Sequence, residues 1–172
     1  MKQNIRQKIL SSLGLGSGKS HDHYSLALII TSISIYLIAI ILEFLMYRPK
    51  FDLFTTILGA ILLTTGWLIR IISHHNLGKQ FRIAVKIVNN HRLITKGIYS
   101  YIRHPMYTGM FLLLLGIALI FSTFYSLYFL VFIIIPIGIH RIYIEERALK
   151  KHFKKQYTTY CKKTKRFVPF LF

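Results

Sequence analysis

Residues 105–139 read PMYTGMFLLLLGIALIFSTFYSLYFLVFIIIPIGI, a run of 35 residues in which tyrosine is the only ionisable side chain. About 20 apolar residues in a helix are enough to cross the hydrocarbon core of a bilayer, so this run is too long for one crossing. The polar residues Ser122, Thr123 and Ser126 lie inside the run and predict a turn. We therefore expect two helices, about 106–122 and 125–144, that form an antiparallel hairpin in the membrane.

Two further apolar segments precede this hairpin. Residues 24–47 contain one ionisable side chain besides tyrosine, Glu43, and residues 53–69 contain none. These segments predict helices over about 24–47 and 53–72. Because Glu43 is near the outer end of the first helix, we expect it to pair with Arg48 at the level of the lipid headgroups. The predicted fold class is an all-α integral membrane protein with about four transmembrane helices.

The chain combines 53% hydrophobic residues with a formal net charge of +18, because its apolar and basic segments are separate. Of the 23 lysines and arginines, four precede the first helix, seven lie in residues 70–104 and ten in residues 141–172. Only two lie in residues 47–52. Since basic loops remain on the cytosolic side, we expect a multi-pass protein with both termini in the cytosol. Basic residues beside membrane helices contact anionic headgroups, so membrane lipids are expected partners and nucleic acid is not.

We expect a single domain over residues 1–172, and the charge pattern divides it into five parts. These are a cytosolic N-terminal segment (1–23), two spans (24–72), a cytosolic connector (73–104), the helical hairpin (105–144) and a cytosolic basic tail (145–172).

The connector and the tail each carry a periodic pattern. In the connector, apolar residues alternate from Phe81 to Ile87 and are followed by Asn89-Asn90, which suggests a short β-hairpin. In the tail, Leu149, Phe153, Tyr157 and Tyr160 recur at helical spacing between lysines. This spacing predicts an amphipathic C-terminal helix that lies on the cytosolic membrane surface with its apolar side down.

Two polar groups are predicted at the cytosolic end of the hairpin. Arg103-His104-Pro105 precedes its first helix and Glu145-Glu146 ends its second, and antiparallel packing brings the two ends together. Pro105 suits the first turn of a helix, whose unpaired N–H groups attract a carboxylate or a ribose oxygen. Arg141 lies four residues before Glu145 and shares its face of the helix. We expect this boundary to bind a zwitterionic ligand beside a lipid.

These residues resemble the isoprenylcysteine carboxyl methyltransferase family over about residues 70–169. The similar motifs are His91-x-Leu93, Gly97-x-Tyr99, Arg103-His104-Pro105-x-Tyr107-x-Gly109 and Glu145-Glu146-x-x-Leu149. The resemblance implies that S-adenosyl-L-methionine is the cofactor, held at the cytosolic membrane edge. It implies cofactor contacts from His91, Arg92, Leu93, Ile94, Tyr99, His104, Pro105, Met106, Tyr107 and Glu145. The family can carry a polar amide seven residues before that first histidine, where this chain has Ala84.

The resemblance also implies that Arg141 is the catalytic residue that meets the substrate carboxylate. Methyl transfer from a sulfonium to a carboxylate needs alignment and exclusion of water, and no base, since a carboxylate is ionised at neutral pH. The favoured function is methyl transfer at the cytosolic face to a lipophilic or prenylated acceptor, with a prenylcysteine-like carboxylate first. One alternative is an N-methyltransferase of phospholipids or other small acceptors, with His104 as the base. Another is a non-catalytic basic membrane scaffold. No metal site is expected.

Overall fold

The computed structural model describes residues 23–78 and 93–167, and every regular element within these ranges is helical. The elements are α2 (His23–Tyr47), α3 (Leu53–Leu77), the 3₁₀ helix η2 (Gly97–Ser100), α4 (Pro105–Ile120), α5 (Phe124–Phe129), the π-helical turn η3 (Leu130–Ile134), α6 (Ile135–Phe153) and α7 (Lys155–Lys163). The predicted all-α fold is confirmed. The possible hairpin after Phe81 lies outside the described residues.

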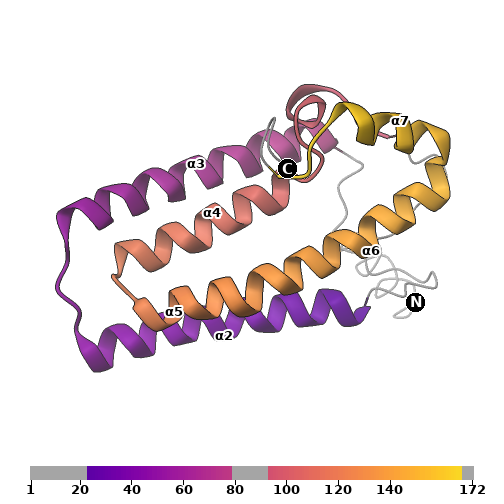
Figure 1. Ribbon diagram of the computed structural model, residues 1–172. Coiled ribbons are helices and arrows are strands. Elements are labelled where there is room, and N and C mark those ends of the chain that lie inside the picture. The colour runs from indigo at the N-terminus through magenta and orange to yellow at the C-terminus, as the bar shows by residue number, and fades with distance from the viewer. Residues whose placement is uncertain (1–22, 79–92, 168–172) are drawn as a thin grey trace, which may run out of the picture.

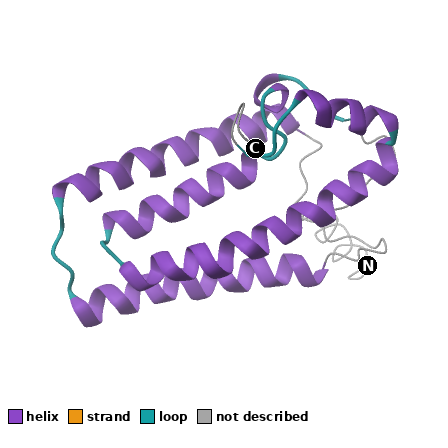
Figure 2. Ribbon diagram, viewed as in Figure 1, coloured by secondary structure: helices purple, strands orange, loops and turns teal. Residues whose placement is uncertain are grey.

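The long helices form two antiparallel pairs (Figures 1 and 2). Helix α3 packs along α4, and α2 packs along the continuous run of α5, η3 and α6. The start of α2, the end of α3, the start of α4 and the end of α6 therefore lie at one end of the molecule, together with α7 (Figure 1). We call this the site end.

Three of these helices are long and apolar enough to cross a membrane: residues 24–47, 53–77 and 124–153. Helix α4 has 16 residues and is about 24 Å long, which is less than the roughly 30 Å of a bilayer core. In the most apolar 18-residue segment of α3, only 11% of the residues are buried inside the protein, as suits a helix that faces lipid. The expected apolar helices are present, and the second and fourth extend further than predicted, to Leu77 and Phe153.

Four glycines hold α4 against α3. A Cβ atom added to Gly66 would lie 2.7 Å from the Gly109 carbonyl oxygen, and one added to Gly59 would lie 2.7 Å from that of Gly116. In both helices the two glycines are seven residues apart, so they share one face, and the antiparallel direction pairs them in reverse order. Close backbone approach at small residues is a main source of helix association in membranes.

Because the glycines pair in this way, α4 begins further from the site end than α3 ends. Helix α3 continues eleven residues past Gly66 to Leu77, whereas α4 begins only four residues before Gly109. At 1.5 Å per residue, the first turn of α4 lies about 10 Å short of the end of α3. Polar side chains on that turn are therefore deeper in the molecule than the helix ends around them.

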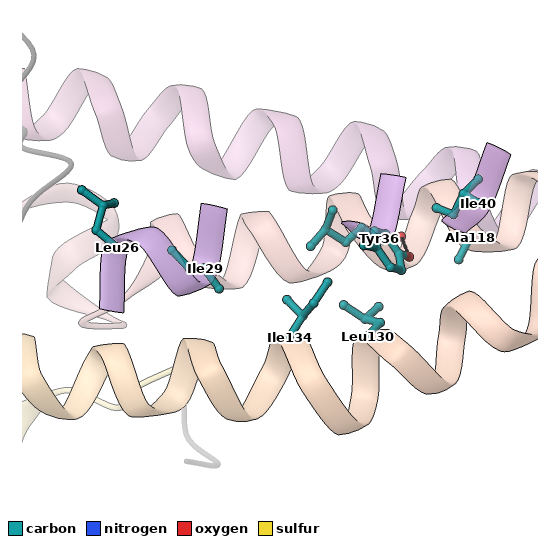
Figure 3. Close-up of a cluster of buried hydrophobic side chains, with 8 residues drawn as sticks. Leu26, Ile29, Tyr36, Ile40, Ala118, Leu130 and Ile134 are labelled. Atoms are coloured by element: carbon teal, nitrogen blue, oxygen red, sulfur yellow. Dashed lines mark hydrogen bonds between the residues drawn. The ribbon is translucent and has the colours of Figure 1, made fainter. Parts of the chain in front are cut away.

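The buried core lies where α2, α4 and η3 meet (Figure 3). Tyr36 is fully buried there, and its hydroxyl donates a hydrogen bond of 2.7 Å to the carbonyl oxygen of Leu114 in α4. Leu130 and Ile134 pack against it from η3. This contact joins the two antiparallel pairs through a polar group that has no access to water.

Glu43 corrects one expectation from the sequence. Its carboxylate accepts hydrogen bonds from the backbone N–H groups of Tyr125 and Ser126, both at 2.9 Å, and from the Ser126 hydroxyl at 2.8 Å. The expected pairing with Arg48 is wrong, because the first N–H groups of α5 have no side-chain cap of their own and Glu43 lies within their reach. Glu43 thus caps one helix from another.

The tail also differs from its prediction. Helix α6 ends at Phe153, and Lys154 adopts φ 46°, which redirects the chain into α7. Tyr157 and Tyr160 are buried, and the Tyr160 hydroxyl donates to the carbonyl oxygen of Tyr99 at 2.6 Å. The predicted amphipathic helix is therefore divided between α6 and α7, and the apolar side of α7 packs against the protein at the site end.

Candidate functional site

Tyr107 and Glu145 join α4 to α6 at the site end. The Tyr107 hydroxyl donates a hydrogen bond of 3.1 Å to Oε2 of Glu145. Tyr99 of η2 lies close enough for the Glu145 carboxylate to act on it electrostatically. Burial, and then this negative charge, raise the pKa of Tyr99, while burial raises the pKa of Tyr160 to about 12. Both phenols are therefore neutral at physiological pH, and Glu145 lies among aromatic hydroxyl groups.

Arg141 lies one turn before Glu145 and reaches toward α2. Its side chain is 3% exposed, and Nη1 donates a hydrogen bond of 3.0 Å to the hydroxyl of Ser25. It also interacts with the Tyr107 hydroxyl. The structure thus brings Tyr99, Tyr107, Arg141 and Glu145 close together, from η2, α4 and α6. Helix α2 contributes the Ser25 hydroxyl that accepts a hydrogen bond from Arg141.

A second group surrounds Glu146, the next residue of α6. Its carboxylate lies 3.2 Å from Nε of Arg103, 3.3 Å from Nε2 of His104 and 2.9 Å from Nη2 of Arg166. Arg103 also donates to the carbonyl oxygens of Cys161 and Thr164. We call these four side chains the Glu146 cluster. It joins α4, α6 and the C-terminal segment.

The Glu146 cluster changes the expected place of His104. The sequence predicts that His104 and Glu145 converge, but consecutive helical residues point about 100° apart, and His104 faces Glu146. His104 is 3% exposed, so it lies inside the cluster. Sequence reasoning gave Arg166 and Glu146 no role in the site, although their opposite charges in a chain with five acidic residues were a usable signal.

The tail pairs with the two residues that lead into α4. The N–H groups of Arg103 and His104 donate to the carbonyl oxygens of Lys165 and Arg166, at 2.7 and 3.1 Å. Those of Tyr107 and Thr108 both donate to the carbonyl oxygen of His104. These four amides are thus engaged within the chain.

The other predicted cofactor residues occupy the surroundings of this site. Leu93 and Ile94 are half-buried in the segment before η2. Pro105 is buried, and the carbonyl oxygen of Met106 accepts a hydrogen bond of 3.2 Å from Nη1 of Arg70. His91 and Arg92 lie outside the described residues, as does Ala84.

An apolar groove of about 420 Å³ lies between α4 and the α5–α6 run. Phe111 and Leu115 line it from α4, and Leu130 and Ile135 line it from the other side. Thr108, which follows Tyr107, lies at its site end together with Phe167. The π-helical turn η3 forms part of the wall, and such turns are frequent at functional sites.

Comparison with known proteins gives consistent results. A sequence model described as phospholipid methyltransferase matches residues 54–156. The Saccharomyces cerevisiae protein-S-isoprenylcysteine O-methyltransferase is 33% identical over 118 residues, which cover 67% of this chain and 49% of the yeast protein. The Arabidopsis thaliana protein-S-isoprenylcysteine O-methyltransferase B is 29% identical over 167 residues, which cover 94% and 81%.

A solved structure also matches. The eukaryotic intramembrane Ras methyltransferase ICMT has a TM-score of 0.67 and 23% sequence identity, over 82% of this chain and 52% of that one. This likeness shows that the fold is shared. The chain spans about half the length of the yeast relative and of the solved chain.

Proposed function

This chain belongs to the phospholipid methyltransferase family, and on that premise we propose that it transfers a methyl group from S-adenosyl-L-methionine to a lipophilic carboxylate, first of all that of a prenylcysteine-like acceptor. The observation that carries the proposal is that a polar site with one acid and one arginine and an apolar groove lie along the same two helices. Tyr107 belongs to the polar site, and the next residue of α4, Thr108, lines the groove. That layout suits a molecule with a charged head and a hydrocarbon chain.

The residues of the site fit the cofactor by their chemistry. S-adenosyl-L-methionine is cationic at its sulfonium and amino groups, and it supplies an activated methyl group when bound. The Glu145 carboxylate suits a positive charge, and the rings of Tyr99 and Tyr107 favour cations near their faces. In the proposal Glu145, Tyr99, Tyr107 and the 91–94 segment hold the cofactor. His104, buried against Glu146, positions the start of α4.

Arg141 is proposed to orient the acceptor carboxylate. A guanidinium carries five N–H donors in a planar fork that matches a carboxylate, so a contact to Ser25 is compatible with this role. No base is required, since the acceptor is already ionised. In the proposal, the recessed start of α4 and the cover formed by α7 limit the access of water to the site, which strengthens the electrostatic alignment of the reactants.

The charge distribution supports a cytosolic orientation for this site. Exposed basic residues gather at the site end, on the last two turns of α6, on α7 and between the two helices: Arg147, Lys150, Lys151, Lys154, Lys155, Lys162 and Lys163. Since basic segments remain on the cytosolic side of a membrane, the proposal places the site end and both termini there. Anionic headgroups of the same leaflet are the proposed partners of these lysines.

Labelled cofactor tests the proposal. Purified protein in lipid nanodiscs is incubated with methyl-labelled S-adenosyl-L-methionine and with N-acetyl-S-farnesylcysteine or phosphatidylethanolamine. Carboxyl methylation yields a methyl ester whose label is released by base, whereas a methylated amine keeps its label. We expect base-labile label on the prenylcysteine. Base-stable label on phosphatidylethanolamine alone would favour the phospholipid reaction that the family description names. Absence of cofactor binding would favour a scaffold.

A further inference from the structure

Phe111 and Gly138 touch across the site end of the apolar groove. A Cβ atom added to Gly138 would lie 2.6 Å from Cζ and 3.0 Å from Cε1 of Phe111, so the tip of the ring rests against bare backbone of α6. A second neighbour of this ring is Phe167, whose ring centroid lies 6.2 Å away. Phe111 therefore contacts both α6 and the C-terminal segment.

This contact lies directly behind the polar site. Phe111 follows Tyr107 by four residues on α4, and Gly138 precedes Arg141 by three residues on α6. Both steps are about one helical turn, and both lead away from the site end toward the middle of the molecule. Phe111 also lines the groove, so a chain that lies in the groove contacts this ring.

We infer that Phe111 and Gly138 form a neck that selects the acceptor by the width of the chain segment next to its reactive head. The inference rests on the proposed function, because it takes the polar site as the place of the head and the groove as the place of the chain. An isoprenoid chain carries a methyl branch close to its thioether, whereas a straight alkyl chain does not. The neck is the point where this branch has to fit.

The bare backbone at Gly138 sets the width of the neck. Carbon atoms in contact lie about 3.5–4.0 Å apart, so an alanine at this position would push the Phe111 ring away by roughly 1 Å. The space on the other side of the ring belongs to the groove and to Phe167. In an apolar pocket, one methylene group changes selectivity by roughly 10-fold to 200-fold. A shift of this size is therefore sufficient to discriminate branched from straight chains.

The test compares two acceptors that share the N-acetylcysteine head, one S-farnesyl and one straight-chain S-alkyl of equal length. Gly138→Ala should lower the kcat/KM ratio of farnesyl to straight chain by roughly 10-fold or more. Phe111→Leu should leave that ratio at or above its original value. The double variant should return toward the original ratio, because the smaller side chain makes room for the added methyl group. Ile133→Ala, an exposed position on the same helical run outside the groove lining, is the matched control.

A second readout separates this inference from the proposed function. The same two acceptors are compared as competitors against a photoactivatable farnesyl probe that labels the protein, which needs no turnover. A changed order of competition in Gly138→Ala supports the neck even if no methyl transfer occurs, and in that case only the proposed function fails. If Gly138→Ala weakens both acceptors equally in both readouts, the contact serves packing alone and the neck is refuted.

Discussion

The Tyr107 hydroxyl donates a hydrogen bond to the Glu145 carboxylate and so connects the first turn of α4 with the last turns of α6. The pair lies at a recessed position, because the glycine register along α3 starts α4 about 10 Å short of the end of its neighbour. The Glu145 carboxylate therefore lies near the apolar groove, and α7 covers the site end from outside. The side chains of the candidate site come from α4 and α6 and, through Tyr99, from η2.

Glu145→Gln should weaken the binding of S-adenosyl-L-homocysteine or S-adenosyl-L-methionine, because the amide keeps the shape of the carboxylate and loses its charge. A hydrogen bond to a charged group contributes about 1.5–3 kcal/mol, which corresponds to a loss of affinity of roughly 10-fold or more. Tyr107→Phe should cost less, since the acid remains. Calorimetry on solubilised protein measures both, with lipid-facing Tyr128→Phe as the control. Unchanged affinity in Glu145→Gln would remove this acid from the cofactor site.

Glu146→Gln should behave differently from Glu145→Gln. It leaves Arg103 and Arg166 without their carboxylate, in a cluster whose glutamate side chain is only 13% exposed. Removing one partner of a largely buried ion pair typically costs about 3–5 kcal/mol, so the unfolding temperature should fall clearly. Arg166→Leu should lower the stability of the Glu146→Gln variant by less than it lowers the stability of the unmodified protein. If the two effects add fully, the ion pair contributes nothing to stability.

Glu43→Ala should destabilise the protein by about 1–2 kcal/mol, because three donors at the start of α5 lose their acceptor. Ser126→Ala should show coupling to this change in a double-mutant cycle, since the two side chains share a hydrogen bond. Arg48→Ala is the matched control. Chemical unfolding in detergent gives the free energies. Coupling of Glu43 to Arg48 and not to Ser126 would restore the pairing that the sequence suggests.

Gly59→Leu should prevent stable packing of α3 against α4, because even a Cβ atom at this position meets the backbone of Gly116 at 2.7 Å. The neighbouring substitution Ala60→Leu faces outward and should be tolerated. The two variants add similar apolar volume to the same helix and differ only in the face that carries it. Yield of monodisperse protein and thermal unfolding compare them. Equal behaviour would contradict the close approach of the two helices.

Local chemistry explains which features the sequence could predict. Segregation of charge from apolar residues determines the helices and the turn near Ser122, and the Arg-His-Pro and Glu-Glu motifs indicate the region of the site. Which side chains pair within that region depends on how each helix is rotated about its axis. His104 faces Glu146, and nothing in the Glu-Glu motif indicates which of the two glutamates takes this place. Glu43 accepts hydrogen bonds from backbone N–H groups 82 and 83 residues away in the sequence. The turn at Lys154 brings the Tyr160 hydroxyl to the carbonyl oxygen of Tyr99. Such contacts arise only from tertiary packing.

The most direct test of the proposed function combines cofactor binding with carboxyl methylation in variants of Arg141. Arg141→Leu should keep most of the cofactor affinity, while ester formation on N-acetyl-S-farnesylcysteine falls by roughly 30-fold or more, as expected when one partner of a desolvated charge pair is lost. Arg141→Lys should recover only part of the rate, because an ammonium lacks the planar fork. Retained cofactor binding shows that each variant is folded. Full ester formation by Arg141→Leu would contradict the proposal that this arginine orients a carboxylate acceptor.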